Sequence, residues 1–138
     1  MYKIHGVTGA VSTFATLPNA ADPSVVPGSN FPCLGNITFD CRHRLLFVSN
    51  LEDGRIYRLD LSGNVLSTFD PGAPDNGLPG WAPLGQRIWA VQWHNDNRLY
   101  FSRWNQDGGS AGVGPNQIWS VALDTAGDFV PGTAQLEI

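Results

Sequence analysis

Basic residues are few in this sequence, with eight Lys and Arg against twelve Asp and Glu among 138 residues and a formal net charge of −4. The basic residues are scattered, so they form no positively charged stripe of the kind that binds the phosphates of a nucleic acid. No apolar run approaches the roughly 20 residues that a membrane-spanning helix needs. We therefore expect neither nucleic-acid binding nor a membrane span.

The N-terminal residues lack the apolar segment that is typical of a signal peptide. If the protein is exported, its signal lies outside these 138 residues. The high content of Gly and Pro (16 and 10 residues), the five Trp and the low Lys content favour an exported bacterial protein. We expect it to be secreted or displayed at the cell surface.

Cysteine is also scarce. Cys33 and Cys41 flank a predicted strand, and eight steps of extended chain would separate them by more than about 20 Å. A disulfide needs Cα atoms within about 7 Å, so we expect two separate thiols. His5, His43 and His94 do not cluster with the cysteines in the sequence. A zinc site needs such a cluster, and we expect no structural metal.

Helical periodicity is missing, because no stretch carries apolar residues at helical spacing over three turns. Short runs rich in β-branched and aromatic residues occur instead, bounded by Gly, Asn, Asp or Pro. Such runs are typical of β-strands. The sequence predicts an all-β fold.

An internal repeat is the most informative feature that is present. The 13 residues that begin at Tyr2 match those that begin at Tyr57 without a gap, and a weaker copy begins at Ile118. Self-similarity at such a period indicates a repeat architecture, in which each unit buries apolar surface against the next.

Each repeat contains four short runs, as in the blade of a β-propeller. Consecutive apolar residues at Leu45–Val48 and Ile88–Val91 favour sheets that are covered on both faces. The expected strands are 36–40, 45–50, 55–60, 64–70, 87–93, 98–103 and 117–123, with 10–16 before them and a last strand within 133–138.

We therefore predict a single domain over 1–138, a β-propeller fragment of four-stranded antiparallel blades that starts in mid-blade. Residues 1–17 would end one blade, 34–70 would form a second and 86–138 a third. Propellers usually need four or more blades to close, so further blades would come from a longer parent chain or from other copies. The alternative is a compact, twisted double sheet that is stable alone.

The runs Leu34-Gly-Asn-Ile-Thr-Phe-Asp40, Leu45-Leu-Phe-Val-Ser-Asn50 and Gly54-Arg-Ile-Tyr-Arg-Leu-Asp60 resemble the blades of NHL-type and gluconolactonase-like six-bladed propellers. The resemblance also extends to propeller segments of large bacterial secreted or surface proteins. It implies a fold more than a function, because such blades occur in hydrolases, scaffolds and receptors. Relatives with lactonase activity hold a divalent metal with Glu, Asn and Asp. Asn36 and Asn50 stand at plausible positions, but no Glu matches, so the metal site is not transferred.

The predicted long connections (17–34, 71–86 and 105–116) all leave from one end of the blades, and the tight turns leave from the other. Long loops on a rigid scaffold are a common place for binding sites. The residues that we predict to bind a ligand there are Asn50, Glu52, Asp53, Trp81, Arg103, Trp104, Asn105 and Asp107.

Trp beside Asn, Asp and Arg can stack on a sugar ring while the polar groups bind its hydroxyls. In the alternative interpretation, Trp81 and Trp104 fill gaps between blades, and Asp53 and Asp107 only shape turns. The oxygen-rich loops leave Ca²⁺ open, although they lack the regular spacing of a known calcium loop. We otherwise expect no cofactor.

Catalytic motifs are missing: there is no Gly-x-Ser-x-Gly, no His-Glu-x-x-His and no glycine-rich phosphate loop. We expect His43 and His94 to be solvated turn residues. Glu52 and Asp53 are adjacent and would point apart, which does not suit a general acid and base. The favoured function is a non-enzymatic module that binds a protein or glycan ligand. The alternative is a fragment of a metal-dependent, lactonase-like hydrolase.

Overall fold

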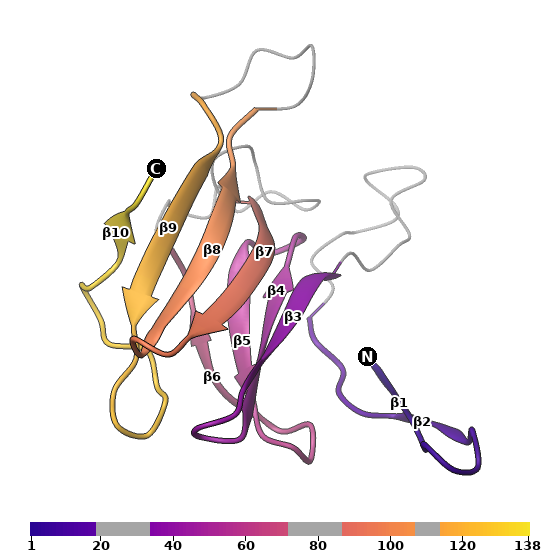
Figure 1. Cartoon of the computed structure of the whole chain (residues 1–138). Helices are drawn as coiled ribbons and strands as arrows, with labels where there is room; N and C mark the ends of the chain where they lie inside the picture. Colours follow the sequence, from indigo (N-terminus) through magenta and orange to yellow (C-terminus); the bar gives the residue numbers. More distant parts are fainter. Residues whose placement is uncertain (19–33, 72–86, 107–113) are drawn as a thin grey trace.

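A computed structural model describes residues 1–18, 34–71, 87–106 and 114–138 of the chain (Figure 1). The regular elements in these ranges are all β-strands, and the described residues include no helix. The predicted all-β class is therefore confirmed. The described residues also include no helix with the length and apolarity that crossing a membrane would require.

Two four-stranded antiparallel sheets form most of the structure, and in both the neighbouring strands follow one another along the chain. The first sheet consists of β3 (Leu34–Asp40), β4 (Leu45–Asn50), β5 (Arg55–Leu59) and β6 (Val65–Phe69). The second sheet consists of β7 (Arg87–His94), β8 (Arg98–Trp104), β9 (Gln117–Ala122) and β10 (Gln135–Leu136). These strands lie where the sequence predicts them. Both sheets are open. The structure therefore shows the predicted four-stranded antiparallel units, but it does not show a propeller.

A two-stranded hairpin precedes the sheets and consists of β1 (Tyr2–Ile4) and β2 (Val11–Thr13). Tyr2 pairs with Thr13, and the matching residues Tyr57 and Thr68 of the next copy pair in the same register. The sequence repeat is thus a structural repeat. The hairpin corresponds to the last two strands of a four-stranded unit.

The two sheets pack face to face, with β7 lying against β3, β4 and β5. Aromatic rings fill the space between them. Phe69 stacks on Phe129 with ring centroids 5.2 Å apart, and it meets Phe101 edge to face at 5.7 Å. Phe47, which is fully buried, meets Phe129 in the same way. Burial of these rings, together with the aliphatic side chains of the same core, stabilises the pair of sheets.

Both sheets contain a β-bulge at the same place in the repeat. In the first, Gly35 and Asn36 of β3 lie opposite the single residue Ser49 of β4. In the second, Trp89 and Ala90 of β7 lie opposite Ser102 of β8. A bulge of two residues against one shifts which side chains point to each face of a strand. It therefore decides which residues of β7 face the first sheet.

The tight turns lie together at the lower end of Figure 1. Those that join the third and fourth strands of each unit share one hydrogen-bonding pattern. Asp60 and Asp124 each accept two backbone N–H groups of their own turn through Oδ1. His5 does the same with Nδ1 in the first copy. Gly63 and Gly127 follow with φ of 89° and 73°, a region in which other residues are strained.

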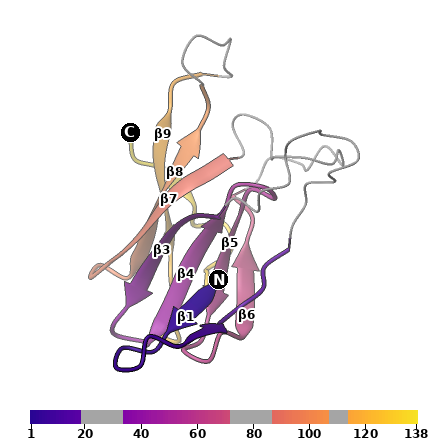
Figure 2. The same ribbon diagram turned by 90° about the vertical axis from the view of Figure 1, so that its right-hand side faces the viewer.

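The segment after the hairpin covers part of the outer face of the first sheet. Figure 1 shows the hairpin on the side of the first sheet that faces away from the second, and in Figure 2 it lies in front of the first sheet, with β1 contacting only β2 among the described strands. Phe14 and Ala15 pack against Val48, Tyr57 and Leu59, which are all buried. The first sheet is therefore covered on both faces over β4 and β5, as its consecutive apolar residues predict.

Candidate functional site

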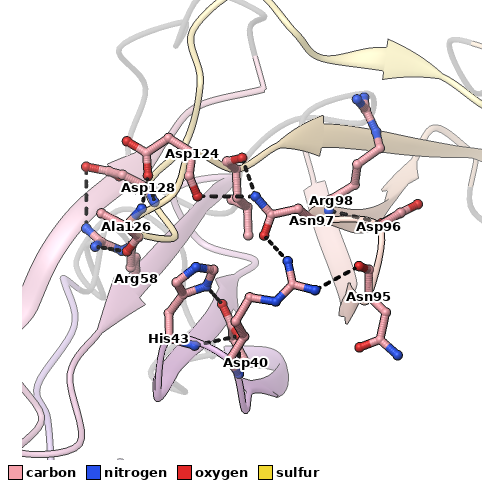
Figure 3. Close-up of polar contacts among 12 residues, drawn as sticks. Asp40, His43, Arg58, Asn95, Asp96, Asn97, Arg98, Asp124, Ala126 and Asp128 are labelled. Carbon is pink, nitrogen blue, oxygen red and sulfur yellow. Dashed lines mark hydrogen bonds and ion pairs between the residues drawn. The ribbon is translucent and has the colours of Figure 1, made fainter.

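The tight-turn end holds the two sheets together through polar contacts (Figure 3). Arg42, from the turn after β3, donates to Oδ1 of Asn97 at 3.4 Å and to the carbonyl of Asn95 at 3.2 Å. Both partners lie in the turn between β7 and β8. Asn97 also donates through Nδ2 to the carbonyl of Leu123 at 2.6 Å. The turn of one unit is thus bonded to the turns of the next.

A second arginine makes a more buried contact at the same end. Arg58 of β5 donates to the carbonyl of Ala126 at 3.0 Å and lies 3.4 Å from Oδ2 of Asp128. Ser67 of β6 donates to the other oxygen of Asp128 at 2.6 Å. These groups join the first sheet to the loop that follows β9. The tight-turn end is therefore a structural joint.

His43 is part of this joint, and the expectation that it is a solvated turn residue is wrong. Its Nδ1 lies 2.6 Å from Oδ2 of Asp40, whose side chain is fully buried, and the His43 side chain is 12% exposed. The backbone of the turn also donates to the Asp40 carboxylate, which gathers the turn around it. His94 is 63% exposed, as expected of a turn histidine.

Two of the predicted ligand-binding residues, Asn50 and Glu52, are buried. Asn50 donates through Nδ2 to the carbonyl of Pro18 at 2.9 Å, and its Oδ1 accepts from the N–H of Glu52. Both line a hollow of about 250 Å³ between the first sheet and the N-terminal segment, which also includes Leu17 and Leu34. These positions give both residues a structural role, and ligand binding by Asn50 and Glu52 stays a prediction.

Asp53 shapes the connection between β4 and β5. Its Oδ1 accepts from the backbone N–H of Arg55 at 3.0 Å, and its Oδ2 accepts from the hydroxyl of Tyr57. Burial raises the pKa of the Asp53 carboxyl, although the hydrogen bond from Tyr57 opposes the shift. Burial and the same hydrogen bond raise the pKa of the Tyr57 hydroxyl. These contacts fit the alternative interpretation, in which Asp53 shapes a turn.

The second sheet carries an open hollow of about 320 Å³ where β7 and β8 approach the long loops. The indole rings of Trp89 and Trp104 meet edge to face in it, with centroids 5.8 Å apart. Trp89 is 50% exposed, so part of its surface is open to a ligand. Ser102, Arg103 and Asn116 complete the lining. We take this hollow as the candidate site.

Cations lie against the aromatic rings around the hollow. The Arg87 guanidinium lies 5.6 Å from the centroid of Trp104, and that of Arg103 lies 4.9 Å from the centroid of Trp119. Burial lowers the pKa of Arg103. Contacts of this kind hold both the cation and the ring in place. They present a fixed aromatic surface beside positive charge.

The remaining predicted residues have different positions. Asn105 is buried and donates to the carbonyl of Pro115 at 2.7 Å, and its N–H donates to Oδ1 of Asn116 at 2.9 Å. It therefore orients Asn116 beside the hollow. Trp81 and Asp107 lie outside the described residues. Of the eight predicted residues, Arg103 and Trp104 line the hollow, and Asn105 supports it.

Three lining residues were not predicted: Trp89, Ser102 and Asn116. Trp89 belongs to an apolar run that reads as a buried strand, and only the bulge in β7 explains its exposure. Ser102 has a signal in the sequence, since it matches Ser49 of the preceding copy. Asn116 precedes a predicted strand, where Asn is common for purely local reasons.

Within the described ranges, no three His, Cys, Asp or Glu side chains lie close enough together to hold a metal ion. Cys41 is a free, exposed thiol, and Cys33 lies outside these ranges. The prediction that the two cysteines remain separate thus stays a prediction.

Comparison of the chain with protein-family models, with curated proteins and with solved structures gives no match. The sheets and the hollow are therefore the observations from which a function can be argued.

Proposed function

We propose that the chain is part of a β-propeller of the NHL-type or gluconolactonase-like kind, in which four-stranded units stack face to face. The equivalent bulges, the equivalent turns and the contact of β7 with β3 and β4 support this proposal. In a propeller, the first strands of successive units lie side by side around the axis, as β3 and β7 do here.

We further propose that the module is non-enzymatic and binds a glycan in the hollow lined by Trp89 and Trp104. The half-exposed indole of Trp89 is the observation that carries the proposal. An indole face is apolar and matches the C–H face of a sugar ring, so stacking removes both surfaces from water.

The polar lining residues suit the hydroxyls of a sugar. Asn116 offers an amide that donates and accepts hydrogen bonds, and the Ser102 hydroxyl oxygen can accept one from a sugar hydroxyl. Arg103 adds positive charge, which would favour a glycan with a carboxylate or sulfate group. A protein ligand with an exposed aromatic or acidic side chain is the second candidate for the same hollow.

An exported protein, secreted or held at the cell surface, would meet such a glycan directly. We propose this location from the composition and from the nature of the ligand. The hydrolase alternative draws no support from the described residues, because a metal-dependent lactonase needs carboxylate and amide ligands that converge on one ion. Calorimetric titration with Ca²⁺ would revive that alternative if it gave binding heat.

The experiment is a titration of tryptophan fluorescence with a panel of neutral and acidic oligosaccharides. We expect at least one acidic oligosaccharide to bind, and Trp89→Ala to weaken that binding at least tenfold. Ile118→Ala is the matched control, because Ile118 lies on the same sheet but outside the hollow. A panel without any binding, or equal loss in both variants, would overturn the glycan proposal.

A further inference from the structure

The two sheets carry equivalent residues on corresponding faces. The repeat aligns Phe47, Ser49 and Ile56 of the first sheet with Tyr100, Ser102 and Ile118 of the second. The strand registers agree, because Ser49 pairs with Ile56 and Ser102 pairs with Ile118. The face of the first sheet that contacts β7 can therefore be compared with the same face of the second sheet.

In the first sheet this face is covered by β7. Phe47 and Ile56 are fully buried in the core that also contains Val91 and Trp93 of β7. Ser49 Oγ accepts from the N–H of the bulge residue Asn36 and donates to the carbonyl of Trp89 at 2.8 Å. The hydroxyl thus joins its own sheet to the first strand of the next.

In the second sheet the same face is open. Ser102 Oγ accepts from the N–H of Ala90 at 3.0 Å, as Ser49 accepts from Asn36. Among the described residues, no acceptor is assigned to its hydroxyl hydrogen, which corresponds to the one that Ser49 donates. Ile118 is 40% exposed, although its counterpart Ile56 is fully buried. A hollow of about 120 Å³, lined by Tyr100, Ser102 and Ile118 among others, opens on this face.

The outer side of β3 shows the complementary difference. Val91 and Trp93, which face the first sheet from β7, are 2% and 8% exposed. Their counterparts Ile37 and Phe39 on β3 are 47% and 48% exposed. Among the described residues, the contact between units is therefore made once, by β7 on the first sheet. The equivalent face of the second sheet and the equivalent side of β3 are exposed.

We propose that the outer face of the second sheet binds another four-stranded unit of this repeat. The first strand of that unit would lie across β7 and β8 as β7 lies across β3 and β4. The hydroxyl of Ser102 would donate to a backbone carbonyl at the bulge of that strand. Apolar residues at the positions of Val91 and Trp93 would cover Tyr100 and Ile118. Continuity with the contact already made between β3 and β7 carries this inference.

A second copy of this chain is a poorer occupant than a repeat unit like β7–β10. The copy would have to dock through the outer face of its first sheet, where Phe14 and Ala15 already cover Val48, Tyr57 and Leu59. In the described part of the chain, no such segment covers the face of β7–β10 that packs against the first sheet. The occupant is therefore a unit that presents a face like that of β7–β10.

This inference rests on the proposed stacking of units and not on the proposed glycan. Trp104 and Asn116 lie on the loop side of Ser102, so a docked strand would form one wall of the hollow. Sugar binding that depends on Trp89 could therefore persist while docking fails, and the reverse also holds. The two proposals are tested separately.

The test extends the full chain at Ile138 with a second copy of its own residues 72–138. In this chain and in the unextended one, Ile118 of the original unit is replaced by Cys, and its reaction with a thiol reagent is followed by mass spectrometry. We expect labelling at position 118 to be at least tenfold slower in the extended chain. Val65→Cys is the control, because Val65 is 44% exposed on β6 of the other sheet and should react equally in both chains.

Equal labelling of position 118 in the two chains would overturn the proposal, whether or not the added unit is folded, because docking is what would bury its face. Replacing the Val91 and Trp93 counterparts in the added copy by Asp should restore fast labelling if docking occurs as proposed. Protection of position 118 in the unextended chain, together with dimers in sedimentation, would replace the repeat unit by a second copy and overturn the choice of occupant.

Discussion

Ser49 and Trp89 are joined by a hydrogen bond of 2.8 Å, from the hydroxyl of one sheet to the main-chain carbonyl of the other. Ser49 has no exposed surface, and its hydroxyl also accepts from Asn36. The bond fixes β7 against β4 at the point where both sheets have their bulge. It is the clearest sign that the units of this repeat are built to contact one another in one orientation.

Ser49→Ala should lower the free energy of unfolding by about 1–3 kcal/mol, because Ser49 is fully buried and its loss removes the partner of the Asn36 N–H and of the Trp89 carbonyl. Ser102→Ala should cost less, since Ser102 is partly exposed and the N–H of Ala90 can bond to water. Urea denaturation followed by tryptophan fluorescence measures both. Equal losses in the free energy of unfolding would mean that the hydrogen bond from Ser49 to Trp89 contributes nothing beyond the bond that each serine accepts within its own sheet.

Gly35→Ala should also loosen the contact between the sheets. A Cβ at position 35 would overlap the carbonyl oxygen of Trp89 and press on Oγ of Ser49. Since backbone atoms cannot move aside cheaply, we expect a loss of about 1–3 kcal/mol in the free energy of unfolding. Gly6→Ala is the control, because a Cβ there meets nothing within 4 Å. Similar melting temperatures for the two variants would contradict the tight approach of β3 and β7.

The two arginines of the joint should differ in importance. Arg58 is 9% exposed and bonds to Ala126 and Asp128 of the other unit, so Arg58→Ala should cost about 1–3 kcal/mol. Arg42 is exposed, and its contacts with Asn95 and Asn97 should contribute about 0.2–1 kcal/mol. Thermal denaturation of both variants at low and high salt checks this. A larger loss for Arg42→Ala would show that the joint depends on surface contacts.

The raised pKa of Tyr57 predicts that the stability of the folded protein falls at alkaline pH. This pKa is raised in the folded protein above the ordinary value for tyrosine, first by burial and then by the hydrogen bond to Asp53. Above about pH 10 the unfolded chain therefore loses the tyrosine proton while the folded chain keeps it. The folded state then holds more protons, so stability falls as the pH rises through this window.

Tyr57→Phe removes this titration, so its free energy of unfolding should fall less steeply above about pH 10 than that of the parent chain. Urea denaturation from pH 8 to pH 11 measures the two slopes. Tyr2→Phe is the control, because Tyr2 is 77% exposed and should leave the slope close to that of the parent. Parallel slopes for the parent and Tyr57→Phe would contradict the shift.

Much of the fold could be predicted from the sequence. The match of Tyr2 with Tyr57 predicts the shared register of β1–β2 and β5–β6, and the structure has it. The Asp60 and Asp124 turns are likewise local, because an Asp side chain bonds to its own turn and Gly accepts the positive φ. The site could be predicted less well. Arg103 and Trp104 were found from their place before a long loop, whereas Trp89 was missed.

The sequence by itself determined that this protein is all-β and built from a repeated four-stranded unit, because strand runs and turn residues act over a few neighbouring positions. Tertiary structure alone decided which face of each strand is covered. Apolar residues on both faces carry no alternation that distinguishes inside from outside, and a bulge of one extra residue reverses the order. Ile56 is buried and its counterpart Ile118 is exposed because β7 lies against the face that carries Ile56, whereas no described strand lies against the face that carries Ile118.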